Sequence, residues 1–139
     1  MARRPHTVVL DSWAVLAFFE GEPAGSTVSE LISEARDHDV PLLMSTVNAG
    51  EVWYIIAREV SEPEADQAVE SLRKMGIEFV DADWPLTRTA GTFKAKHRMS
   101  YADCFAAALA KSRKADLVTG DKEFKQVEHD ITVRWLARS

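Results

Sequence analysis

The sequence predicts an α/β fold of three layers, α/β/α, in which a central parallel sheet of about five strands carries helices on both faces. Short apolar runs alternate along the chain with longer segments of helical periodicity. Strands separated by helices pair in parallel through βαβ crossovers. The 139 residues, 46% of them hydrophobic, suffice for one core, so we expect a single domain over residues 1–139.

The first half of the chain contains two predicted strands and three predicted helices. The buried runs "TVVL" and "LLMS" have the length and composition of strands, and "EGEPAGS" should break the chain between two helices. After Ser26, apolar residues that include Val28, Leu31 and Ile32 recur at helical spacing. The predicted elements are a strand at 7–10, helices at 12–19 and 26–36, a strand at 42–45 and a helix at 46–60.

Capping signals define the helices of the second half. Ser61 and Glu64 form a capping-box pattern, and Gly76 should end that helix as a C′ residue. Ser100 is the expected N-cap of a later helix that carries Asp103 three residues on. The predicted elements are helices at 62–75, 85–97 and from 101 onward, strands at 77–82, 116–119 and 131–136, and a helical turn at 123–127.

Composition excludes several classes of protein. One cysteine, Cys104, rules out an internal disulfide, and the four histidines show no short metal-ligand spacing. The net charge of −5 is not the basic balance typical of nucleic-acid binding. Positive charges do gather at 94–98 and 111–114, where they either complement the dipole at helix C-termini or steer a phosphate backbone.

Targeting and phosphate-binding signals are also missing from the sequence. Asp11 interrupts the apolar run near the N-terminus, no cleavage site follows, and no apolar stretch approaches the ~18 residues of a membrane span. We therefore expect a cytoplasmic protein without membrane contact. The sequence has neither a P-loop nor a dinucleotide fingerprint, and Trp13 stands where an aspartyl phosphatase needs its second acid.

Four carboxylates fall at one predicted edge of the sheet. Asp11 directly follows one apolar strand and Asp121 lies two residues past another, while Glu51 and Asp103 lie in the first turns of helices. Taken singly, each has a structural explanation as a helix cap, a turn residue or a solvated helix position. Taken together, they would repel each other unless some are protonated or a cation lies among them. Oxygen ligands favour Mg²⁺ or Mn²⁺, which drive phosphoryl transfer.

The motifs around these acids resemble those of the PIN-domain ribonucleases, and among them the small VapC-type toxins of type II toxin–antitoxin pairs. The matching stretches are "VVLDSWAVLAFF", "STVNAGEVWY", "SYADCFAAALA" and "ADLVTGDKEF", in that order and over nearly the whole chain. The resemblance implies a PIN-like sheet of order 3-2-1-4-5 and an endoribonuclease (a hydrolase) that uses Mg²⁺ or Mn²⁺ and leaves a 5′-phosphate and a 3′-hydroxyl. It also implies a homodimer and a VapB-type antitoxin as partner.

The resemblance also assigns roles to individual residues. Metal ligation or general-base catalysis falls to Asp11, Glu51, Asp103 and Asp121. Supporting roles fall to Thr119, Ser12 and Asn48. The alternative is a PIN-like module that binds RNA or protein without cutting. Aromatic residues of the first three helices should form an apolar groove for an antitoxin segment: Trp13, Phe18, Phe19, Trp53 and Tyr54.

Overall fold

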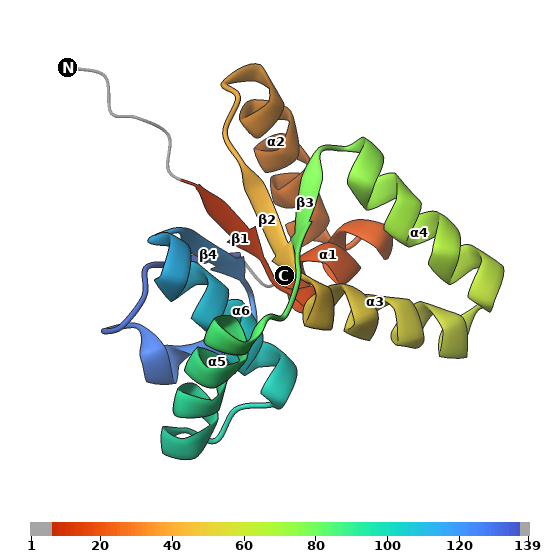
Figure 1. Ribbon diagram of the computed structural model, residues 1–139. Helices are drawn as coiled ribbons and strands as arrows, with labels where there is room; N and C mark the ends of the chain where they lie inside the picture. The colour runs from red at the N-terminus through yellow and green to blue at the C-terminus, as the bar shows by residue number, and fades with distance from the viewer. Residues whose placement is uncertain (1–6, 137–139) are drawn as a thin grey trace.

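A computed structural model describes residues 7–136 and shows a five-stranded parallel sheet of order β3-β2-β1-β4-β5 with helices on both faces (Figure 1). The strands are β1 (Val8–Leu10), β2 (Leu42–Ser45), β3 (Ile77–Val80), β4 (Asp116–Thr119) and β5 (Val133–Trp135). The predicted fold class and the order 3-2-1-4-5 are confirmed. Strand order reverses beside the central strand β1, which is where open α/β sheets bind ligands.

Six α-helices and one 3₁₀ turn connect these strands in the described part of the chain. They are α1 (Ser12–Phe19), α2 (Pro23–Asp37), α3 (Thr46–Glu59), α4 (Glu62–Lys74), α5 (Trp84–Lys96), α6 (Tyr101–Arg113) and η1 (Lys122–Val127). The predicted capping residues are confirmed, because the hydroxyls of Ser61 and Ser100 accept the N–H groups of Glu64 and Asp103. Gly76 follows α4 with φ of 93°, as a C′ residue does.

Alternating residues of the central strands divide the core into two clusters. Val9 faces a cluster that contains α5 and α6, whereas Val8 and Leu10 face a cluster that contains α1 and α2. Figure 1 shows these two helix pairs on opposite sides of the sheet. Strands buried on both faces explain the continuous apolar runs in the sequence. Each fully buried aliphatic side chain contributes roughly 1.5–3 kcal/mol to folding.

The start of α2 corrects one sequence-based expectation. The helix begins at Pro23 rather than at Ser26, so the predicted break is limited to residues 20–22. Proline is favourable in the first helical turn because it has no N–H to satisfy there. Gly25 then lies so close to α1 that an added Cβ would stand 2.6 Å from the carbonyl oxygen of Ala17. Proline thus begins this helix, and glycine allows the helix to approach α1 closely.

Two strands are shorter than predicted by two residues or more, and for β3 the reason is that its partner strand ends. Ser45, the last residue of β2, pairs with Val80, and α3 begins at the next residue. Beyond Val80 the third strand therefore has no neighbour, and it ends there instead of at residue 82. On the other side, β5 spans residues 133–135 rather than 131–136, opposite the short β4.

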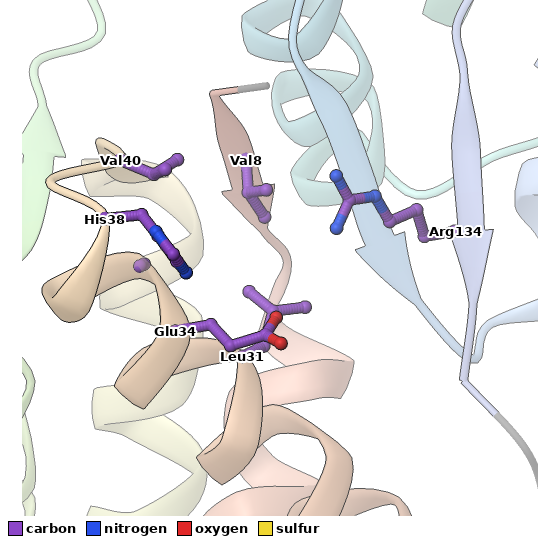
Figure 2. A pocket seen from close by; sticks show the side chains of 7 residues that line it. Val8, Leu31, Glu34, His38, Val40 and Arg134 are labelled. Atoms are coloured by element: carbon purple, nitrogen blue, oxygen red, sulfur yellow. The ribbon is translucent and has the colours of Figure 1, made fainter. Parts of the chain in front are cut away.

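A cavity of about 210 Å³ lies at the amino-terminal end of β1, beside Val8 (Figure 2). Figure 2 shows Glu34 and His38 projecting from α2 on one side and Arg134 of β5 on the other. Arg134 is already paired with Asp116 at 2.8 Å. The predicted acids lie at the opposite, carboxyl edge of the sheet, so this cavity is separate from them. Within residues 7–136, no helix has the length and apolarity needed to cross a membrane.

Candidate functional site

Asp11 and Thr119 come together because of the sheet register. Leu10 pairs with Val118, so the next residues, Asp11 and Thr119, lie side by side at the carboxyl ends of β1 and β4. The Asp11 side chain is completely buried; its Oδ1 accepts the Ala14 N–H at 2.9 Å, and its Oδ2 accepts the hydroxyl of Thr119. Thr119 Oγ1 in turn accepts the N–H of Asp121 at 3.0 Å. The predicted helix cap at Asp11 is therefore confirmed, but a cap alone does not require complete burial.

Asp103 and Asp121 lie beside a third acid that the sequence reasoning missed. Carboxylate oxygens of Asp103, Asp121 and Glu123 all lie within 4.8 Å of one another. Asp103 is only 8% exposed, and Glu123 is on the surface. Asp121 Oδ1 accepts the Glu123 N–H at 2.9 Å, which turns the chain so that both side chains reach the same place. The signal that was available is the stretch "GDKE", with a second acid two residues after Asp121.

Glu51 completes the group of four predicted acids. It is half-buried near the start of α3, and it interacts electrostatically with both Asp11 and Asp103. Asp103 also interacts with Asp11 and Asp121. The structure therefore brings all four predicted carboxylates into one region at the carboxyl edge of the sheet, as the strand-end argument expected.

Burial and mutual repulsion raise two of the carboxyl pKa values. Burial raises the pKa of Asp11 to about 7, against the hydrogen bonds from Thr119 and Ala14 that favour its charged form, and repulsion by Asp121 and Glu51 adds to the rise. Burial likewise raises the pKa of Asp103 to about 8, with repulsion from Asp121, Asp11 and Glu51 as further causes. Acids with such pKa values are typical of functional sites.

Asn48 connects the three helices that carry the acids. It is fully buried; its Oδ1 accepts the Ser45 hydroxyl at 2.7 Å, and its Nδ2 donates to Ser12 Oγ at 3.3 Å and to the Ala102 carbonyl at 3.0 Å. Ser12 adjoins Asp11, and Ala102 adjoins Asp103. Asn48 itself lies three residues before Glu51. This network gives Asn48 and Ser12 positioning contacts, and it adds Ser45, which the sequence reasoning did not single out.

The donor set fits a hard divalent cation. The candidate ligands are all carboxylate oxygens, which Mg²⁺ and Mn²⁺ prefer. Oxygens bonded to one Mg²⁺ at ~2.1 Å lie at most about 4.2 Å apart, so the 4.8 Å limit among Asp103, Asp121 and Glu123 is close to that need. A cation would also favour the charged forms of Asp11 and Asp103, whose pKa values the protein alone raises.

Comparison with protein families decides the identity of the domain. The family model of the PIN domain matches residues 8–130, nearly all of the described chain. The chain belongs to the PIN-domain family. A search of curated proteins found no significant match.

Solved structures that resemble this PIN domain include VapC toxins and VapBC complexes. DNA-bound VapBC from Salmonella typhimurium aligns with a TM-score of 0.75 and 16% identity, over 96% of this chain and 100% of that chain. VapBC2 from Rickettsia felis, bound to a promoter DNA fragment, aligns with a TM-score of 0.73 and 17% identity, over 94% of this chain and 99% of that chain. VapC20 from Mycobacterium tuberculosis is described as a toxin that cleaves the sarcin–ricin loop. It aligns with a TM-score of 0.70 and 16% identity, over 87% of this chain and 95% of that chain. At these identities the likeness shows a shared fold.

The ring of Trp13 packs closely against the turn that carries Asp121. A Cβ added at Gly120 would lie 2.3–2.6 Å from three ring carbons of Trp13, well inside any permitted contact. Gly120 does not have a positive φ, so the backbone itself would accept alanine. The glycine is required by the close approach of the indole ring, which follows Asp11 by two residues.

Gly120→Ala should therefore destabilise the PIN domain by about 1–3 kcal/mol, the usual cost of overpacking. Combining it with Trp13→Ala should recover most of that loss, because the second change removes the clashing ring; urea unfolding of both singles and the double measures this coupling. The matched control is Gly91→Ala in α5, where an added Cβ has nothing within 4 Å. It should stabilise the helix by about 0.5–1 kcal/mol. Additive effects at Trp13 and Gly120 would contradict the contact.

Proposed function

We propose that this PIN domain is a Mg²⁺- or Mn²⁺-dependent endoribonuclease that acts in the cytoplasm as the toxin of a type II toxin–antitoxin pair. One observation carries the proposal: buried Asp11 and Asp103, together with Glu51 and Asp121, share one region at the switch point of the sheet. Burying repelling carboxylates costs stability. A module that only binds a partner gains nothing from such a group of carboxylates, whereas a metal-dependent nuclease needs the group to bind its cation.

Asp103, Asp121 and Glu123 would hold the metal from one side, and Asp11 and Glu51 would complete its surroundings. The ion would supply a Lewis acid for the phosphate and a means of activating water at neutral pH. The chain's own residues set the geometry. Thr119 donates to Asp11 Oδ2 while accepting the Asp121 N–H, so one hydroxyl connects the Asp11 carboxylate to the backbone of Asp121. Asn48 holds α3 against α1 and α6 through its amide.

The aromatic residues of the first helices support the proposed VapB-type partner. None of the five predicted groove residues is fully buried: Trp13, Phe18, Phe19 and Trp53 are half-buried, and Tyr54 is 44% exposed. Phe18 and Phe19 pack edge to face, with ring centroids 5.3 Å apart. Partly exposed aromatic side chains of this kind suit an apolar segment of a partner protein. A homodimer forms part of the same proposal.

Two measurements test the function. Purified protein should fragment a pool of structured RNAs in Mg²⁺ or Mn²⁺, should stop when EDTA is added, and should leave 5′-phosphates. Expression alone should arrest growth, and co-expression of the product of the adjacent reading frame should restore it. RNA that is bound but never cut in either metal would favour the non-catalytic module instead.

A further inference from the structure

A basic groove of about 280 Å³ runs between α5 and α6. Arg88, Lys96 and His97 line it from α5 and its C-cap, Lys111 lines it from α6, and Asp130 lies at its edge. Three permanent positive charges thus face one negative charge, on a protein whose net charge is −5. Cations at helix ends can simply complement the helix dipole. Arg88, however, lies in the interior of α5, and its charge extends the positive surface beyond the helix ends.

An aromatic floor holds two of these groups in place. Phe93 is almost completely buried beneath the groove, and the Lys111 ammonium lies 5.6 Å from the centre of its ring. The ring of His97 lies 6.3 Å from the same ring, centre to centre. A cation held over an aromatic face has fewer conformations to lose when it meets an anion. Arg88 and Lys96 are eight residues apart on one face of α5, about 12 Å along the helix axis.

Hydrogen bonds join the end of this groove to the acidic site. The side chain of Gln126 in η1 accepts the Arg98 N–H and donates to the Arg98 and Glu123 carbonyls, each at 3.1 Å. η1 also carries Glu123 and begins after Asp121. On α6, Lys111 follows Asp103 by eight residues, again about 12 Å. The groove and the acids are therefore held at fixed positions relative to each other by η1 and α6.

We propose that the α5–α6 groove binds the sugar–phosphate backbone of the RNA on one side of the bond that is cut. This assignment rests on the proposed ribonuclease function and names the path of its substrate. Positive charges spread along about 12 Å of helix match the repeated phosphates of a strand better than a single anion. The positive charges would contact phosphates, which are the same at every nucleotide of a strand, so the groove should bind RNA with little dependence on sequence.

The test is the affinity of wild type and variants for a fluorescein-labelled single-stranded RNA, measured by anisotropy in EDTA over a range of salt concentrations. Each lost phosphate contact should lower the salt slope by about 0.7, which corresponds to about 5-fold weaker binding at 0.1 M salt. Lys96→Gln and Lys111→Gln together should therefore weaken binding about 25-fold. The control, Lys74→Gln, changes an exposed lysine at the end of α4 and should leave affinity and slope unchanged.

The outcomes separate the groove from the nuclease. The double variant must first show an unchanged thermal melt. If it then binds RNA as tightly as wild type does, the proposed role of the groove is wrong, even if wild type cleaves RNA in Mn²⁺. If the double variant binds RNA more weakly but wild type never cleaves RNA, the groove is an RNA-binding surface and the proposed nuclease activity is wrong. Loss of binding to the co-expressed partner, with RNA binding intact, would assign the groove to the partner and contradict the proposal. The single variant Lys96→Gln repeats the test without altering the contact with Phe93.

Discussion

Asp103→Asn should lower RNA cleavage by at least about 100-fold and should end growth arrest, while the protein still folds. Removing a residue that merely orients a metal ligand costs 10–100-fold, and a ligand should cost more. The Asp103 carboxylate lies within 4.8 Å of those of Asp121 and Glu123. Asparagine keeps its shape and the N-cap bond from its backbone N–H to Ser100, but it removes the charge. Cleavage rates of purified proteins at saturating Mn²⁺ measure the effect.

The matched control is Asp37→Asn, which makes the same chemical change on the exposed end of α2. Its cleavage rate should equal that of wild type. Two sets of metal ligands can be compared: the close group of carboxylates that includes Glu123, and the four acids of the sequence motifs, which do not include it. Glu123→Gln distinguishes them. It should raise the Mn²⁺ concentration needed for half-maximal cleavage. A folded Asp103→Asn protein that cleaves at the wild-type rate would rule out the site as described.

The shared region of the four predicted acids could be located from the sequence because it depends on strand ends. Asp11 follows "VVL" and Asp121 follows "DLVTG", and carboxyl ends of parallel strands share one edge of a sheet. The capping signal at Ser100 fixed the start of α6 to within a residue, and with it the place of Asp103. Element bounds were wrong mainly where a partner strand ended, at residue 80, or where proline began a helix, at residue 23.

The remaining features depend on contacts that no local pattern contains. Glu123 joins the acids only because the 3₁₀ turn folds the chain back after Asp121. The Asn48 network requires three helices to meet at one amide, 36 residues from Ser12 and 54 from Ala102. Gly120 reads as an ordinary turn residue until the indole ring of Trp13 is found against it. Sequence spacing specifies which edge a residue reaches, and packing specifies which neighbours it has there.

The metal-free protein should lose stability as the pH rises. The folded-state pKa values of Asp11 and Asp103, about 7 and about 8, lie above the value of 3.8 expected for an unfolded aspartate. Between these values the folded state binds more protons than the unfolded state, so the free energy of unfolding decreases with increasing pH. This contribution is complete below about pH 4 and is lost through pH 8, by at most about 1.4 kcal/mol per pH unit for each proton.

Removing one of these charges should therefore stabilise the protein without metal. Asp103→Asn should raise the free energy of unfolding in EDTA at pH 8.5 by roughly 1–2 kcal/mol, although most substitutions destabilise. At pH 5, where Asp103 is protonated in the folded wild type, the two proteins should differ little. Urea unfolding at both pH values measures this. Asp37→Asn, with its exposed side chain, should match wild type at each pH.

Mn²⁺ should reverse the order of the two proteins. A ligand at a hundred times its dissociation constant stabilises the folded state by about 2.7 kcal/mol, or roughly 10 °C in melting temperature for a domain of this size. Wild type should gain this at pH 8.5 and much less at pH 5, because protons and Mn²⁺ compete for the same oxygens. Asp103→Asn should gain little at either pH. Equal Mn²⁺ shifts in wild type and in the Asp11, Glu51, Asp103 and Asp121 variants would mean that these carboxylates do not share a cation, and that Asp121 only caps the 3₁₀ turn.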